Sequence, residues 1–174
     1  MSQYEEIWTQ GTQLYALGED QSGKKTVFKV DGVHGLTPGE ATKNEIPITT
    51  LEDKAKRSMN GLLDPGTASF SIYLRKGNKG HRNLEHFYKT DQKVKFAIGL
   101  DDGFGQDATL EGDDFDLPKG RTWFVFDGSV KSFPPVINDD SAVAVNINIQ
   151  VSGEGGFVWP EDGVETKSFP SYED

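Results

Sequence analysis

The chain has 174 residues, of which 34% are hydrophobic and 26% charged, proportions that are ordinary for a folded protein rather than a disordered one. Its formal net charge of −10 argues against a simple nucleic-acid-binding protein, which normally carries an excess of basic residues. The lack of cysteine excludes disulfides, thiolate metal sites and a cysteine nucleophile.

Neither a membrane partner nor export is expected. No apolar run approaches the roughly 20 residues that a membrane helix needs. The start, "MSQYEEIWTQ", is acidic and lacks the basic and apolar regions of a signal peptide. We therefore expect synthesis in the cytoplasm.

The two ends of the chain are predicted to be arms rather than parts of the domain, which would then span residues 11–153. Residues 1–10 and 154–174 have a composition that does not fold alone. They nevertheless carry aromatic side chains, which predict contacts with neighbouring subunits: Trp8, Phe157, Trp159, Phe169 and Tyr172. The second arm is strongly acidic.

Between the arms, apolar and polar residues alternate with a period of two, which is the pattern of half-buried β-strands. Seven strands are predicted, at 12–17, 26–33, 45–49, 68–74, 93–100, 122–130 and 143–151. Seven strands from one chain favour a mainly β fold, an antiparallel β-sandwich or barrel. In the last of them, "VAVNINIQV", a polar face is formed by Asn146, Asn148 and Gln150.

The segment "LEDKAKRSMNGLLDPG" at 51–66 joins two predicted strands, but it far exceeds the two to five residues of a usual hairpin loop. We predict a long loop over 50–66. It combines charged and apolar side chains that predict contact with another surface: Leu51, Lys54, Lys56, Arg57, Met59, Leu62 and Leu63. Thr50 and Asp53 match a weak capping box, so a short surface helix stays an alternative.

One segment departs from the strand period. In "HRNLEHFYKT", Leu84, Phe87 and Tyr88 lie at i, i+3 and i+4, which predicts one short flanking helix at about 81–90. Charge is also segregated, because bases dominate 75–95 and acids fill 101–116. Opposite charges at opposite ends favour head-to-tail stacking; ordinary solvated faces are the alternative.

No local motif supports catalysis. A near match to a phosphate-binding loop at 18–26 has Lys25 where Ser or Thr must hold magnesium. The spacing of His81 and His86 does not align them for a shared metal ion. We therefore expect a protein that is not an enzyme and that has no metal site and no cofactor.

The stretch "DGVHGLTPGEATKNEIPITTLEDKAKRSMNGLLDPGTASFSIYL" at 31–74 resembles the major tail tube proteins of bacteriophages with long, non-contractile tails. The shared features are a strand, the "GLTPGE" turn, a second strand, a long loop with an "LLDPG" exit and the "SFSI" strand. A helix, further strands and an acidic tail follow. The resemblance covers roughly residues 10–152.

This resemblance implies a β-sandwich or barrel whose six copies form a ring, with rings stacked into a hollow tube in the virion tail. The tube would conduct double-stranded genomic DNA to the host. The loop at 50–66 would reach into the adjacent ring, and the arms would contact neighbouring subunits. Implied partners are further copies of the chain, tail-tip initiator and terminator proteins, and a tape measure protein in the lumen.

The resemblance leaves the role of the polar face open. Asn146, Asn148 and Gln150 are expected to line the lumen or to contact another subunit, with ordinary solvent-facing polarity as the alternative. Two other functions also stay open. A carbohydrate-binding β-sandwich would stack Trp123 or Trp159 on a sugar, and the tube of a contractile tail or secretion system would require a surrounding sheath.

Overall fold

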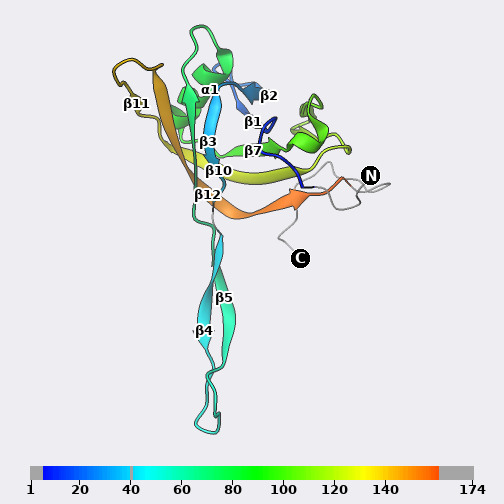
Figure 1. Cartoon of the computed structure of the whole chain (residues 1–174), viewed down its shortest axis with the longest axis vertical. Helices are drawn as coiled ribbons and strands as arrows, with labels where there is room; N and C mark the ends of the chain where they lie inside the picture. The colour runs from blue at the N-terminus through cyan, green and yellow to red at the C-terminus, as the bar shows by residue number, and fades with distance from the viewer. Residues whose placement is uncertain (1–5, 40, 161–174) are drawn as a thin grey trace.

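The computed structural model describes residues 6–39 and 41–160, which form a mainly β domain with one α-helix and a long projecting ribbon (Figure 1). The elements in chain order are β1 (Gln13–Glu19), β2 (Lys25–Val30), β3 (Val33–Thr37), β4 (Thr42–Pro47), β5 (Ser58–Asp64), β6 (Thr67–Tyr73), α1 (Lys79–Thr90), β7 (Val94–Gly99), the 3-10 turn η1 (Asp101–Gly103), β8 (Thr109–Glu111), β9 (Asp114–Asp116), β10 (Trp123–Ser132), β11 (Pro135–Val136) and β12 (Ala144–Val158).

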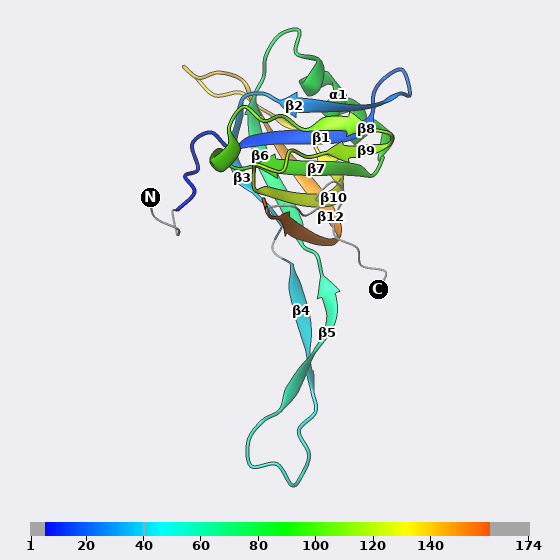
Figure 2. The same cartoon turned by 90° about the vertical axis from the view of Figure 1, so that its right-hand side faces the viewer.

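The domain is built on one antiparallel sheet in the order β2-β1-β7-β10-β12-β6-β3, with β11 paired to β12. The pairs β4–β5 and β8–β9 are separate two-stranded sheets. The long strands β10 and β12 curve across the domain (Figures 1 and 2) and connect strands β2, β1 and β7 on one side of the sheet with β6 and β3 on the other. The predicted fold class is confirmed: mainly β and antiparallel, with a single helix.

The larger core lies on one face of this sheet. Because β-strands alternate their side chains between two faces, Val145, Ile147 and Ile149 of β12 are buried, whereas the polar residues between them are exposed. Their partners across the core come from β1, β6, β7 and β10. Leu84 and Phe87 of α1 close this core, as their spacing predicts.

A smaller core lies on the opposite face. Tyr15, Ala97 and Trp123 point to this side of the sheet and pack against Phe115 and Leu117. The segment from η1 through β9 therefore covers one part of the outer face. Asn146 and Asn148, on β12, are exposed.

The helix begins two residues before the predicted 81. The side chain of Asn78 accepts a hydrogen bond of 3.1 Å from the amide of His81, which caps the first turn. The helix ends at Thr90, and the C-cap residue Asp91 has a φ of 53°, which lies in the left-handed region. Tyr88, predicted on the apolar face, is exposed.

Three predicted boundaries are wrong. The segment 50–66 is neither a loop throughout nor a helix, because Ser58–Asp64 pairs with β4 and leaves only 48–57 as the connection. The sheet also continues past 153, since β12 runs to Val158. The run 26–33 is two strands, β2 and β3, because the chain turns at Gly32, which has a φ of 74°. A side chain would also be crowded there, since a Cβ on Gly32 would lie 3.0 Å from the carbonyl oxygen of Tyr73.

Candidate assembly surfaces

The β4–β5 hairpin extends away from the domain as a narrow ribbon (Figures 1 and 2). Ile46 pairs with Met59, and Lys43 pairs with Leu63. None of the other strands or the helix within residues 6–39 and 41–160 forms a layer on either face of the hairpin. Its apolar side chains are largely open to solvent: Leu62 is 82% exposed and Met59 53%. Leu63 is only half-buried. The hairpin therefore presents apolar side chains that its own domain does not cover.

The tip of the hairpin is held by local hydrogen bonds. The Asp53 carboxylate accepts from the backbone amide of Thr50 at 2.7 Å and from its hydroxyl at 3.1 Å. Arg57 lies 3.5 Å from Asp53. The bonds from Thr50 hold the pKa of Asp53 below its ordinary value. The pair that resembles a capping box thus closes a turn. Leu51, Lys54 and Lys56, beside this turn, are exposed.

The exposed face of β6 and β12 is polar and uncharged. Cross-strand pairs place Asn146 beside Ser71 and Asn148 beside Ser69. Ser71 donates to the side-chain oxygen of Asn146 at 2.6 Å. Gln150 donates to the carbonyl oxygen of Gly66 at 3.2 Å. The structure therefore brings the three predicted residues together on one face that offers amide and hydroxyl groups.

Aromatic side chains gather where β12 ends. Phe157 contacts Phe124 edge to face, with ring centroids 5.0 Å apart, and stacks on Trp159 at 4.9 Å. Phe157 and Trp159 are each about half exposed. Trp8, in the N-terminal arm, is 72% exposed. Phe169 and Tyr172, also predicted contact residues, lie outside the described residues.

Trp123 is not available for a ligand, which removes one of the two side chains proposed to stack on a sugar. It is fully buried, and its ring nitrogen donates to the carbonyl oxygen of Pro118 at 3.0 Å. Its ring meets that of Tyr15 edge to face. Trp123 is a core residue.

Sequence reasoning missed Arg121, a cation that is fully buried. Its guanidinium donates five hydrogen bonds of 2.6–3.2 Å and lies over the ring of Trp123. The acceptors are the carbonyl oxygens of Gly11, Gly99, Leu100 and Gln106 and the side-chain oxygen of Gln13. Arg121 thus ties the start of β1 and the segment after β7 to the start of β10.

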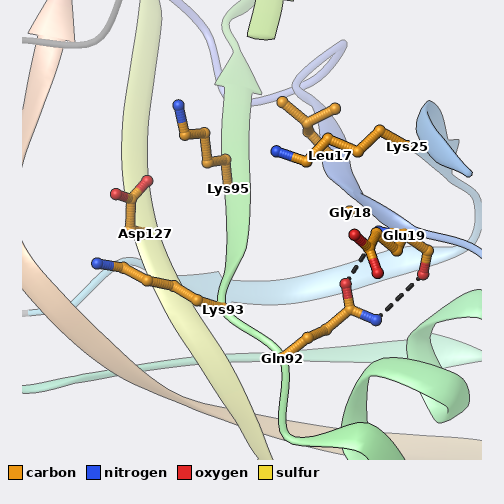
Figure 3. A pocket seen from close by; sticks show the side chains of 8 residues that line it. All are labelled: Leu17, Gly18, Glu19, Lys25, Gln92, Lys93, Lys95 and Asp127. Carbon is orange, nitrogen blue, oxygen red and sulfur yellow. Dashed lines mark hydrogen bonds between the residues drawn. The ribbon is translucent and has the colours of Figure 1, made fainter. Parts of the chain in front are cut away.

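A surface pocket of about 370 Å³ lies between β1, β7 and β10 (Figure 3). Gln92 bonds the backbone of Glu19 in both directions, at 2.9 and 3.1 Å. The carboxylate of Asp127 lies between the side chains of Lys93 and Lys95 in this view. Burial raises the pKa of Asp127, and the two lysines offset part of that effect.

The lining of this pocket consists of charged, amide and apolar residues. None of its lining residues is a Ser, Thr, Cys or His that an adjacent base would activate as a nucleophile. Among residues 6–39 and 41–160, no cluster of three or more His, Asp or Glu side chains suits a metal ion. No helix in these ranges is long and apolar enough to cross a membrane.

Two solved structures with a similar fold come from a tail tube and from a contractile injection system. The tail tube of phage SPP1 matches with a TM-score of 0.62 at 14% identity, covering 85% of this chain and 77% of that one. The sheath/tube terminator of the contractile injection system PVC matches with a TM-score of 0.64 at 10% identity, covering 90% and 99%. The domain therefore has the fold of phage-type tail tubes.

Sequence comparison identifies the family. The model of the family described as phage tail tube, TTP, lambda-like matches residues 5–161. Structural protein 3 of Pseudomonas phage PAJU2 is 31% identical over 152 residues, which cover 85% of this chain and 91% of that protein. The chain belongs to the lambda-like phage tail tube family. It is a structural protein of the virion tail, and the resemblance seen in its sequence is confirmed.

Proposed function

We propose that six copies of this chain close into a ring, and that each ring inserts its β4–β5 hairpins into the adjacent ring of a hollow tail tube. The observation that carries this proposal is the hairpin itself, which extends beyond the domain with Leu51, Met59 and Leu62 exposed. Subunits of this kind would be made in the host cytoplasm and assembled there.

The energetics favour a neighbour on the hairpin. An isolated two-stranded hairpin is marginally stable in water, and this one lacks a layer against either face. Full burial of a Leu or Met side chain is worth about 1.5–3 kcal/mol, so Leu62 and Met59 gain most when another subunit covers them. The strand pairing is already present in the single chain, which lowers the conformational entropy lost on stacking.

The polar face of β6 and β12 is the proposed lining of the lumen. DNA carries about one negative charge per 1.7 Å of axis, so a basic channel would hold it and a strongly acidic one would repel it. Asn146, Asn148 and Gln150 offer hydrogen bonds without net charge. Such a surface suits a tape measure protein during assembly and double-stranded DNA in passage.

Negative-stain electron microscopy tests the proposal. Concentrated protein, with and without tail-tip initiator proteins, should give hollow filaments with six-fold end views. A chain that stays monomeric under both conditions, or that forms rings of another order, would contradict it. Terminator proteins should bind the ends of these filaments and stop their growth.

A contractile-tail tube is the second candidate, because the fold also matches a chain from the baseplate of the anti-feeding prophage, with a TM-score of 0.59 at 8% identity. The lambda-like family model favours the non-contractile tail. Purified tubes from infected cells distinguish the two, since a contractile system would show a sheath around them.

A further inference from the structure

The end of the domain opposite the hairpin carries an open pocket of about 520 Å³. The loop between β6 and α1 forms one side of it, at the top in Figure 1. Its apolar side chains are Leu74, Phe133 and Val143, of which Leu74 is 49% exposed and Val143 37%. The amide of Leu74 donates to the carbonyl oxygen of Val143 at 2.8 Å, which fixes the apolar floor.

Basic side chains line the same pocket. Arg75, Lys76 and Arg82 line the pocket, and none of them takes part in the ion pairs found within residues 6–39 and 41–160. The acid beside them, Glu85, already pairs with Lys89 at 3.4 Å. The pocket therefore combines an apolar floor with positive charge, and it suits a peptide that carries aromatic and acidic residues together.

The chain contains such a peptide beyond the described residues. The segment 161–174, "EDGVETKSFPSYED", has the single base Lys167. Its acids are Glu161, Asp162, Glu165, Glu173 and Asp174. Phe169 and Tyr172 precede the last two acids by one to five residues. Pro170 disfavours a helical conformation for the residue before it. The sequence "FPSYED" thus matches the pocket in both charge and apolarity.

Distance favours another copy as the binding partner of this segment. The pocket includes Val143, next to the first residue of β12, whereas the segment follows the strand's last residue. β12 has 15 residues, a path of about 50 Å, and Figure 1 shows its ends on opposite sides of the domain. Residues 161–169 span at most about 32 Å when fully extended. A return to the pocket of its own chain would therefore use most of that length on crossing the domain again, whereas binding to another copy makes no such demand.

The directions of the elements agree with docking between stacked copies. Both views place the end of β12 at the side of the domain from which the hairpin leaves, and α1 at the other side. A head-to-tail neighbour therefore presents the start of its acidic segment toward the basic pocket. From these observations we infer that the segment 165–174 of one subunit binds the Leu74–Val143 pocket of the next subunit in the stack.

This inference rests on the proposed stacking and is tested separately from it by disulfide trapping, which is clean because the chain has no cysteine. Val143→Cys and Ser171→Cys are made in separate full-length chains, mixed under assembly conditions and oxidised. A disulfide between the two chains is expected. The control replaces Val143→Cys by Thr109→Cys, an exposed position in the acidic segment of β8, and should give roughly tenfold less product.

Charge reversal tests whether the basic residues that line the pocket attract the acidic segment. Arg75→Glu combined with Lys76→Glu should lower the trapped yield roughly tenfold, and Glu173→Lys with Asp174→Lys in the other chain should restore it. A chain carrying both cysteines that closes on itself in dilute solution would overturn the assignment to a second copy.

The outcomes separate the two proposals. Filaments without a disulfide between positions 143 and 171 would overturn the pocket assignment and leave the tube proposal standing. The disulfide without filaments would support the pocket and count against the tube. If neither appears, both are wrong.

Discussion

The guanidinium of Arg121 and the backbone of Gly99 are in direct contact, with the Nη2 of Arg121 donating to the carbonyl oxygen of Gly99 at 2.9 Å. A Cβ on Gly99 would lie 2.6 Å from the guanidinium carbon. Glycine is therefore required here because the buried cation occupies the space of a side chain, and the charge is stabilised by carbonyl dipoles.

Replacement of Arg121 by Met is expected to destabilise the subunit strongly. The variant leaves the buried carbonyl oxygens of Gly99 and Leu100 without their donor, and each unsatisfied group costs about 1–3 kcal/mol. We expect the free energy of unfolding to fall by roughly 3 kcal/mol or more, measured by urea denaturation of the monomer. Arg57→Lys, at an exposed arginine, is the control and should change it by less than about 0.5 kcal/mol. Equal stability of the two variants would contradict this role.

Leu62→Ser should leave the monomer folded and impair stacking. Leu62 is largely exposed in the single chain, so its loss changes monomer stability by less than about 0.5 kcal/mol. If stacking buries it, the lost apolar contact of about 1.5–3 kcal/mol should raise the critical concentration for filaments by at least roughly tenfold. Light scattering measures the assembly and thermal unfolding the stability. Asn60→Ser, in the same strand, is the control, and an unfolded Leu62→Ser monomer would place Leu62 in the core instead.

Asn148→Lys tests the lining of the lumen. The substitution adds one positive charge per subunit to the polar face, which would retain passing DNA. We expect phage carrying it to assemble tails of normal length and to eject DNA more slowly, with the neutral Asn148→Ser as control. Failure to assemble tails would show that this face contacts another subunit, and unchanged ejection would remove it from the channel.

The pH dependence of stability should contain a contribution from Asp127. Because burial raises its pKa in the folded state, the folded protein binds this proton more tightly, and the ionised carboxylate lowers stability at neutral pH. That loss is relieved as the pH falls through the raised pKa toward the ordinary value of 3.8. Asp127→Asn should therefore be more stable than the natural chain at pH 7, with the difference shrinking toward acid.

Urea midpoints from neutral to acid pH measure this effect. Asp139→Asn, at an exposed position, changes the net charge equally and should show no such trend. A lower stability of Asp127→Asn at pH 7 would mean that Lys93 and Lys95 stabilise the carboxylate by more than its burial costs.

The central strands and the helix could be predicted from the sequence because each has one buried face. Val145, Ile147 and Ile149 alternate with exposed polar residues, and Leu84 and Phe87 lie one helical turn apart. These patterns record burial, which is the property that amphipathic periods report. The polar face of 146–150 follows from the same alternation.

The hairpin and Arg121 could not be predicted because neither leaves a periodic pattern of burial in the local sequence. Strand β5, "SMNGLLD", has no buried face, so its apolar residues follow no single period and the segment reads as a loop. Arg121 is buried through contacts with backbone atoms up to 110 residues away, and no local pattern marks it. The turn at Gly32 separates strands whose combined sequence reads as one run.

The opposite placement of the hairpin and of α1 gives the subunit a direction, and any filament of such subunits inherits it. At one terminus of the filament the hairpins project without a neighbouring ring, and at the other the surfaces that would bind hairpins are uncovered. Growth is therefore chemically different at the two termini, and a protein that seeds one of them cannot cap the other by the same contacts.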